Sequence, residues 1–300
     1  MENTSTHILS PSFLADLKTV TKMRLSVSVV FSAIAGYFLG ADHIDFVTVL
    51  LLAIGGYLMV GASNTFNQMM EHKTDALMER TRSRPLAAGR MSMNTALIIG
   101  LSFTIMGIWV LYTINPTTAL FGVTSIGLYV LAYTPLKLKT PLSVFVGAFP
   151  GAIPFMMGWI AATNNFGIEA GTLFIIQFFW QFPHFWALGW WLYDDYKKGG
   201  FFMLPTGKRD RATALQTILY SLWTLAVSLI PAFGITGRLY LSTFSAVLIF
   251  LLGVGLIYYA VKLYKKRTAQ VARELMFASV SYITLLQIIY VLDKYIRLWI

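Results

Sequence analysis

Three polar side chains stand at four-residue intervals near the end of a long apolar run: Asn67, Glu71 and Asp75. If that run is a helix, the three fall within an arc of about 80° and along about 12 Å of its axis. Two carboxylates and an amide oxygen suit a hard cation such as Mg²⁺, which fills its coordination shell with water and phosphate oxygens. We expect these residues, called the strip below, to bind a metal; the alternative is a solvated helix end with scattered charges.

Basic side chains follow the strip and recur in other loops. Planar guanidinium forks suit phosphate oxygens, so the ligand expected beside the metal is a diphosphate. The residues predicted to bind it are Lys22, Arg24, Arg80, Arg82, Arg84, Lys137, Lys139 and Lys198. Asp194 and Asp195 are a second pair of carboxylates, which we expect to face the strip across a central cavity and to share in metal binding and catalysis.

His184 follows Pro183 inside another apolar stretch. A histidine at membrane depth is costly unless it faces protein or a cavity. One interpretation is a neutral histidine bonded to a neighbouring helix through Gln177 or Gln181. The other is contact with a cofactor-like substrate, as iron ligand, orienting group or proton carrier. On the second interpretation, His184 joins the strip, Asp194 and Asp195 in the predicted catalytic set.

The composition indicates a membrane protein. The 300 residues are 57% hydrophobic and only 12% charged, with a mean hydropathy of +0.66. A soluble domain carries about 25% charged residues. Apolar stretches recur at the length of about 20 residues that a helix needs to cross a bilayer. The absence of cysteine excludes disulfides, iron–sulfur clusters and thiolate zinc sites.

These stretches predict an all-α polytopic membrane protein with about nine transmembrane helices around a central cavity. We expect residues 1–300 to form a single domain, with residues 1–20 as a loosely ordered cytoplasmic segment. Within it, residues 1–12 are expected to be loosely held, and a short amphipathic helix is expected over 12–21. The predicted spans cover residues 25–39, 46–70, 93–112, 117–133, 142–162, 172–193, 214–233, 240–264 and 274–291.

Lysine and arginine residues predict the orientation, because short cytoplasmic loops carry an excess of them. Of the 23 such residues, 20 fall on one side of the predicted topology, and Arg238, Lys294 and Arg297 fall on the other. The first side holds the N-terminus, the strip and the loop 194–211, so we expect it to be cytoplasmic and the C-terminus to be outside. The net charge of +10 reflects this topology and gives no reason to expect nucleic acid as a partner.

The strip and the residues after it resemble the UbiA-type membrane prenyltransferase superfamily. Its motif Asn-x-x-x-Asp/Glu-x-x-x-Asp matches Asn67–Asp75, and Arg-Thr-x-x-Arg-Pro-Leu matches Arg80–Leu86. Trp180–Phe185 and Asp195–Pro205 resemble the haem-prenylating branch of that superfamily. The chain departs from the common pattern at Met23, Glu71 and Ser143, where proline, aspartate and asparagine respectively are usual. In addition, the second acidic pair lacks the Asp-x-x-x-Asp spacing of quinone-type relatives. The missing spacing of the second acidic pair favours the haem branch.

The resemblance implies a UbiA-like fold and transfer of the farnesyl group of farnesyl diphosphate to a vinyl group of haem B, with addition of water, giving haem O. It implies Mg²⁺ as cofactor and haem B as a substrate, not a prosthetic group. The residues that it implies for haem binding are Trp180, Gln181, His184 and Tyr196.

The resemblance also implies a location in the lipid bilayer of a bacterial inner membrane. A downstream haem A synthase or terminal oxidase assembly is the implied partner. One alternative is the same fold with a quinone precursor or a chlorophyllide-like acceptor. The other is a transporter, which would place key polar residues near the membrane midplane in several spans.

The charge bias predicts the position of reporter fusions. A reporter fused after Lys139 or Lys265 should lie in the cytoplasm, and one fused after Thr163 or Gly237 should lie outside. Paired phosphatase and fluorescent-protein fusions measure this. A fusion at Lys139 with phosphatase activity would contradict both the orientation and the single face predicted for the polar loops.

Overall fold

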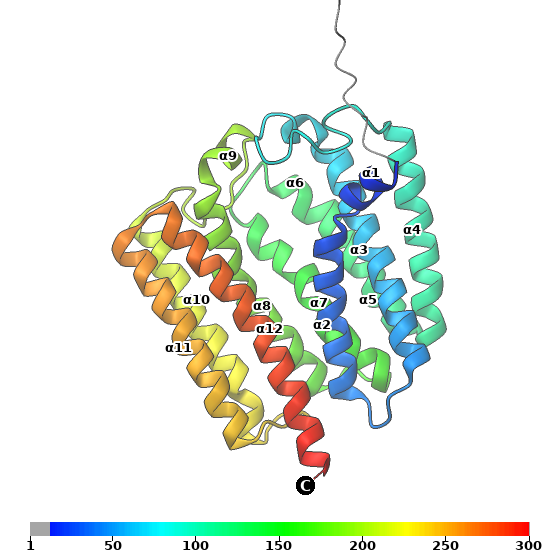
Figure 1. The fold of residues 1–300 in the computed structure, drawn as a ribbon, viewed down its shortest axis with the longest axis vertical. Coiled ribbons are helices and arrows are strands. Elements are labelled where there is room, and N and C mark those ends of the chain that lie inside the picture. The colour runs from blue at the N-terminus through cyan, green and yellow to red at the C-terminus, as the bar shows by residue number, and fades with distance from the viewer. Residues whose placement is uncertain (1–12, 300) are drawn as a thin grey trace, which may run out of the picture.

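The computed structural model of the chain describes residues 13–299; the segment 1–12, predicted to be loosely held, and residue 300 lie outside them. Between residues 13 and 299 the regular secondary structure is helical (Figure 1). The helices are α1 (Phe13–Val20), α2 (Met23–Gly40), α3 (Phe46–Asp75), α4 (Met93–Ile114), α5 (Pro116–Gly127), the π-helix η1 (Leu128–Tyr133), α6 (Thr134–Leu136), α7 (Ser143–Thr163), α8 (Ile168–Trp191), α9 (Tyr193–Lys198), α10 (Arg211–Leu229), the 3₁₀-helix η2 (Ile230–Phe233), α11 (Thr243–Lys266) and α12 (Ala269–Trp299).

The prediction of an all-α membrane protein is confirmed. In the described part, eight helical segments are long and apolar enough to cross a membrane, with α5, η1 and α6 forming one of them and α10 with η2 another. The remaining long helix is α8, which has 24 residues. Gln177, Gln181 and His184 lower its hydropathy, but its length matches the other spans. Eight spans and α8 together agree with the expected number.

Most spans begin at a side chain that accepts a hydrogen bond from the first helical turn. Asp45 accepts from the amides of Val47 and Thr48 at the start of α3. Asn115, just before Pro116, caps α5 in the same way, and Ser92, Asp210 and Ser242 cap α4, α10 and α11. Because such caps satisfy amides that have no partner within the helix, the sequence marks these helix starts locally.

The spans form a bundle whose polar loops gather at one end. Neighbours in sequence mostly pack together, and α12 closes the bundle by packing on α8, α11 and α2. Figure 1 shows α1, α9, the connection between α3 and α4 and the α11–α12 turn at one end, and the C-terminus at the other. The loops predicted to share a membrane face therefore lie at the same end of the bundle.

Prolines interrupt the hydrogen bonds of α7 and α8 without ending either helix. Both Pro150 and Pro154 lie inside α7, and Pro183 lies inside α8. A proline has no N–H, so the carbonyl four residues before it loses its donor. For Pro154 that carbonyl belongs to Pro150, and the hydroxyl of Ser125 on α5 donates to it at 3.3 Å. A neighbouring helix thus supplies the donor that the proline lacks.

Glycines allow α2 and α7 to approach closely. A Cβ added to Gly158 would lie 1.8 Å from the carbonyl oxygen of Ala33, and one added to Gly36 would lie 2.0 Å from the carbonyl oxygen of Phe155. These neighbours are backbone atoms, which cannot move aside as a flexible side chain can. The contact matters for the site because the turn before α2 and the loop before α7 both reach the strip.

We expect Gly158→Ala to destabilise the protein by about 1–3 kcal/mol, because the added methyl group forces α2 and α7 apart. Thermal unfolding in detergent measures this loss. Gly255→Ala on α11 is the matched control, since a Cβ there meets nothing within 4 Å. Equal unfolding temperatures for the two variants would contradict the tight α2–α7 contact.

Candidate active site

The strip lies on one buried face at the end of α3. Asn67 is 1% exposed, Glu71 4% and Asp75 1%. The alternative of a solvated helix end is therefore wrong for these three side chains. Because charged groups are rarely buried without partners, their surroundings must supply hydrogen bonds or opposite charges.

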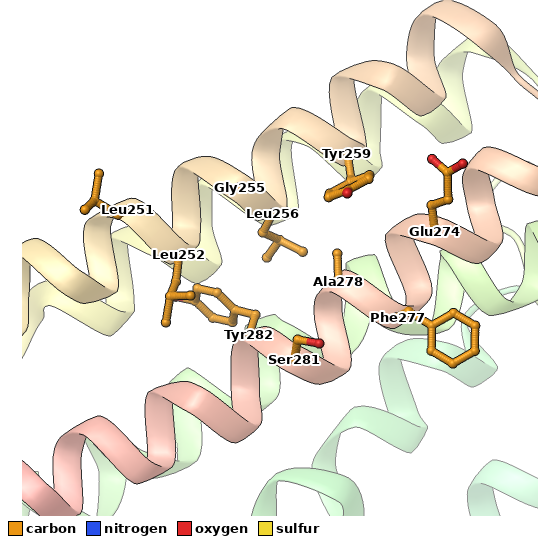
Figure 2. Close-up of a pocket in the computed structure, with 10 residues that line it drawn as sticks. All are labelled: Leu251, Leu252, Gly255, Leu256, Tyr259, Glu274, Phe277, Ala278, Ser281 and Tyr282. Carbon is orange, nitrogen blue, oxygen red and sulfur yellow. The ribbon is translucent and has the colours of Figure 1, made fainter.

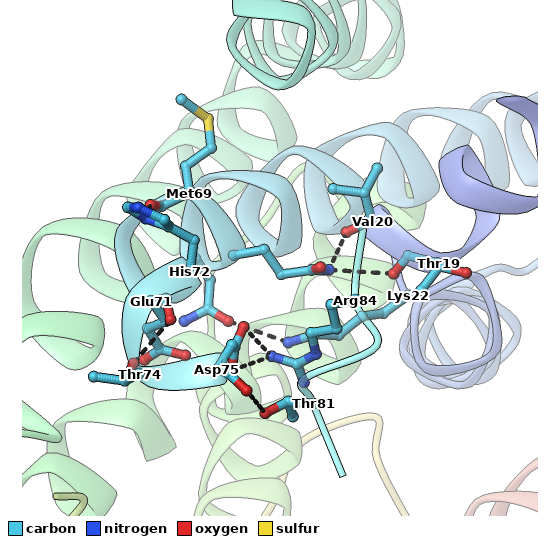
Figure 3. Close-up of polar contacts among 12 residues, drawn as sticks. Thr19, Val20, Lys22, Met69, Glu71, His72, Thr74, Asp75, Thr81 and Arg84 are labelled. Carbon is cyan, nitrogen blue, oxygen red and sulfur yellow. Dashed lines mark hydrogen bonds and ion pairs between the residues drawn. The ribbon is translucent and has the colours of Figure 1, made fainter. Parts of the chain in front are cut away.

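Three cations from three different loops supply those partners. Arg84 donates through Nη1 to both carboxylate oxygens of Asp75, at 2.8 and 2.7 Å (Figure 3). Lys137, itself 8% exposed, forms an ion pair with Glu71. The ammonium of Lys22 donates to the amide oxygen of Asn67 at 3.2 Å. The strip thus has one basic partner for each of its side chains.

Lys22 has an unusual backbone conformation and an ammonium with a shifted pKa. It stands in the turn between α1 and α2 with φ +47°, the left-handed region that side chains other than glycine seldom adopt. Burial lowers the pKa of its ammonium to about 7, and the cations of Arg84 and Lys137 act in the same direction. Glu71 and Asp75 oppose that shift. A further anion close to Lys22 would favour its charged form.

The π-helix η1 positions the amide of Asn67. The wide turn carries Thr134 to a place where its hydroxyl donates to the carbonyl of Tyr129 at 2.9 Å. The same hydroxyl oxygen accepts from the side-chain amide of Asn67 at 3.2 Å. The Asn67 carbonyl oxygen is thereby oriented toward Lys22. Single π-helical turns often occur at functional sites. The contact of Thr134 with Asn67 was not predicted from the sequence.

The loop after α3 is folded back by two contacts. The hydroxyl of Thr81 donates to the backbone carbonyl of Asp75 at 2.9 Å (Figure 3). The carboxylate of Asp195 in α9 accepts from the backbone amides of Glu79 and Arg80, at 2.7 and 3.3 Å. This loop carries Arg84, so Asp195 acts on the strip through the loop that it holds.

Asp194 and Asp195 bond groups outside the strip. Asp194 is 78% exposed and pairs with Arg209 at 2.9 Å, while Asp195 binds backbone amides. Within residues 13–299, no group of three or more His, Cys, Asp or Glu side chains could hold a metal ion. A metal or catalytic role for either aspartate stays a prediction.

The other basic residues predicted to bind diphosphate are exposed and have no contact with the strip in the described part. Arg82 pairs with Glu79 on the surface. Arg80 lies over the ring of Tyr196, with its guanidinium carbon 5.6 Å from the ring centre. The exposed residues are Arg24, Arg80, Arg82, Lys139 and Lys198. The structure therefore gathers only Lys22, Arg84 and Lys137 at the strip.

Among the predicted haem-binding residues, Trp180 and His184 lie together on α8. Their rings stack with centres 4.8 Å apart and an angle of 19° between the planes. Both rings bond Ser279 on α12: Trp180 Nε1 donates to its carbonyl at 2.6 Å, and His184 Nδ1 lies 2.9 Å from its hydroxyl oxygen. Nothing in the sequence singled out Ser279 as the partner.

His184 bonds a neighbouring helix, as one of the two interpretations had it, but it does so through Ser279 and not through Gln177 or Gln181. Gln181 donates to the carbonyl of Ala148 on α7 at 2.8 Å, and Gln177 accepts from Gln287 on α12 at 3.1 Å. Both contacts join α8 to a neighbouring helix. Gln181 is buried, and these contacts indicate a structural role for it.

Two cavities lie in different parts of the bundle. A groove of about 520 Å³ runs between α11 and α12 (Figure 2), with apolar walls that include Leu252 and Phe277 and with Glu274 at one end. No strip residue lines it. A smaller cavity of about 30 Å³ lies among α2, α3, α5 and α7, and Ser63 is part of its wall. Ser63 precedes Asn67 by about one helical turn, so this small apolar space adjoins the strip along α3.

Comparison with known families agrees with this geometry. A family model described as the UbiA prenyltransferase family matches residues 29–282, a range that contains the strip and His184. The chain therefore belongs to the UbiA prenyltransferase family, and the resemblance stated from the strip motif is confirmed.

Two curated relatives are similar over nearly their whole length. A protein of Christiangramia forsetii named Protoheme IX farnesyltransferase is 70% identical over 300 residues, covering all of both chains. A protein of Flavobacterium psychrophilum with the same name is 60% identical over 289 residues, covering 95% of this chain and 96% of the relative.

Solved structures share the fold at low identity. A digeranylgeranylglyceryl phosphate synthase superposes with a TM-score of 0.77 at 17% identity, covering 93% of this chain and 98% of its own. A UbiA homologue of Archaeoglobus fulgidus bound to GPP and Mg²⁺ superposes with a TM-score of 0.67 at 12% identity, covering 92% and 99%. At such identities the likeness concerns the fold alone.

We predict that Asp195→Ala loosens the loop after α3. The charge-assisted hydrogen bonds to two amides are worth about 1.5–3 kcal/mol each, so exchange at Glu79 and Arg80 should accelerate about tenfold or more. Amide hydrogen exchange with mass detection measures this. Asp194→Ala is the control, since it removes a neighbouring carboxylate that is exposed and bonded to Arg209. Similar exchange in both variants would show that Asp195 does not hold the loop.

Proposed function

We propose that this chain transfers the farnesyl group of farnesyl diphosphate to a vinyl group of haem B, giving haem O. The C–O bond of farnesyl diphosphate breaks, and its electron pair leaves with the diphosphate. A vinyl carbon of haem B forms the new C–C bond. Water then adds to the resulting cation with loss of a proton. Haem B is a substrate in this reaction.

The buried strip with its three cations is the observation that carries the diphosphate half of the proposal. Arg84 and Lys137 are paired with Asp75 and Glu71, and both can exchange a carboxylate for phosphate oxygens of higher charge. Lys22, whose ammonium is already held at the strip by Asn67, gains a stronger partner as well. Preorganised cations of this kind stabilise the charge that develops on the leaving diphosphate.

The donor set of the strip fits Mg²⁺. Two carboxylates and an amide oxygen on one buried face are hard oxygen ligands, and they leave coordination positions for water and phosphate. The residues that would hold the ion are Asn67, Glu71 and Asp75. When bound, Mg²⁺ supplies a Lewis acid that neutralises the leaving group. The chain's own contribution is to keep these oxygens buried and close to Arg84 and Lys137.

The assignment of haem B as the acceptor is supported by the relatives and by His184. A relative named Protoheme IX farnesyltransferase is 70% identical over the whole chain. The stacked pair of Trp180 and His184 offers an aromatic face and an imidazole at membrane depth. Both features suit an apolar iron macrocycle. Apolar surroundings also keep water from the allylic cation until the vinyl carbon has reacted.

We also infer that the protein lies in a bacterial inner membrane, with the strip and its loops on the cytoplasmic side and the C-terminus outside. The excess of Lys and Arg at the strip end supports this orientation. The product would pass to haem A synthase or to a terminal oxidase under assembly.

Conversion of haem B tests the function directly. Membranes containing the protein should convert haem B, farnesyl diphosphate and Mg²⁺ to a haem whose mass is greater by one farnesyl group and one hydroxyl group, as measured on extracted haems. Chelation of Mg²⁺ should stop the conversion. Prenylation of a quinone precursor by the same membranes, with haem B unchanged, would contradict the haem assignment while keeping the reaction class.

Substitutions in the strip test the metal ligands. Glu71→Gln and Asp75→Asn should lower turnover about 100-fold or more, and Glu71→Asp should keep most of it, since the carboxylate remains. Glu274→Gln is the matched control, because it also removes a carboxylate paired with a lysine, on α12. Near-normal turnover of Asp75→Asn across a Mg²⁺ titration would contradict the strip as metal site.

Stability must be separated from catalysis, because Glu71→Gln leaves the buried ammonium of Lys137 without its partner. The double variant Glu71→Gln/Lys137→Gln removes both charges. Its unfolding temperature should return toward that of the parent protein, whereas its turnover should stay low. Recovery of turnover in the double variant would mean that the single substitution acted through folding.

A further inference from the structure

The seam between α8 and α12 anchors two stacked rings on one residue. Trp180 and His184 are four positions apart on α8, so their side chains lie one above the other. Trp180 Nε1 donates to the backbone carbonyl of Ser279 at 2.6 Å, and His184 Nδ1 lies 2.9 Å from its hydroxyl oxygen. Ser279 itself is fully buried. One residue of α12 therefore fixes both rings.

The hydrogen bonds of Ser279 determine which nitrogen of His184 carries the proton. The Ser279 hydroxyl donates its single hydrogen to the carbonyl of Met276, at 2.6 Å, and that carbonyl can only accept. The hydroxyl oxygen must then act as acceptor toward His184. Nδ1 is accordingly the protonated nitrogen of the neutral ring, and Nε2 keeps its lone pair.

We propose that Ser279 is a positioning residue that holds His184 in the Nδ1–H tautomer, so that Nε2 presents its lone pair to the haem substrate. This inference rests on the proposed function. Only a nitrogen with a free lone pair can bind iron or accept a proton, so the opposite tautomer would present an N–H that can do neither. Histidines that bind metals usually donate their other N–H to a fixed acceptor in the same way, and that acceptor sets the ring orientation.

The tautomer can be measured without any substrate. The protein has four histidines, and ¹⁵N labelling of histidine with His184→Gln as reference identifies the signals of the ring on α8. We expect a protonated Nδ1 and an Nε2 with a free lone pair. A protonated Nε2 in the parent protein would overturn the inference, whatever the protein does with haem B.

Substitution of Ser279 tests the consequence for haem B. Ser279→Thr keeps a hydroxyl that can donate to the same turn of helix. Ser279→Val introduces a side chain of nearly the same shape as threonine but without a hydroxyl. We expect Ser279→Val to weaken haem B binding about 10- to 100-fold and to shift its Soret band, and we expect the same direction of change for His184→Ala. Ser279→Thr should stay within a few-fold of the parent protein. The affinity for farnesyl diphosphate should change in neither.

Because Thr and Val differ little in size, any loss from overpacking is shared by both and cancels in the comparison. Ser279→Ala removes the same hydroxyl with a smaller side chain. Its matched control is Ser281→Ala, which removes the hydroxyl of an exposed serine two positions along the same helix. Equal haem B affinity and Soret bands in Ser279→Val and Ser279→Thr would overturn the positioning role. If the parent protein converts haem B while Ser279→Val and Ser279→Thr have the same haem B affinity and Soret band, only the positioning role of Ser279 fails. If the parent protein neither binds nor converts haem B, the proposed function fails.

Discussion

The burial of two carboxylates at the end of α3 is the constraint on which the rest of the site depends. Removing a charge from water costs several kcal/mol unless opposite charges and hydrogen bonds replace the solvent. Glu71 and Asp75 are each within a few per cent of full burial, and each has a basic partner. The loops that carry Arg84 and Lys137 must therefore meet at α3, and this requirement explains much of how one end of the bundle is organised.

Several features that are far apart in the sequence bring these loops to the end of α3. The close contact of α2 and α7 through Gly36 and Gly158 brings the turn before α2 near the loop before α7. The π-helix places Thr134 against Asn67, and Asp195 holds the loop after α3 by its backbone amides. None of these features touches a metal or a diphosphate in our proposal. They set the position of the groups that do.

The site combines two environments in one bundle. The strip end is charged, with cations supplied by three loops. The α8–α12 seam is aromatic and lies at membrane depth, where His184 bonds Ser279 of α12. A reaction between a diphosphate ester and an apolar macrocycle needs both environments. In our proposal, the strip end helps the leaving group depart, and the seam receives the acceptor away from water.

The sequence by itself determined the features that depend on local spacing. Apolar runs of membrane length predicted the spans, and a four-residue interval placed Asn67, Glu71 and Asp75 on one face, because helix geometry fixes both without reference to other segments. Helix caps such as Asp45 and Ser92 were equally local. The motif of the strip also sufficed to identify the family.

Only the tertiary structure decided which distant groups meet. Eight basic residues were predicted for the diphosphate, but three reach the strip, since loop side chains take partners according to how the helices pack. For the same reason, the carboxylate of Asp195 accepts a hydrogen bond from a backbone amide of the loop after α3. One interpretation of His184 was a bond to a neighbouring helix through Gln177 or Gln181, and the structure has that bond run to Ser279, 95 residues along the chain. Such a pairing leaves no pattern in the sequence, because it depends on the contact of two helices and not on the spacing within either.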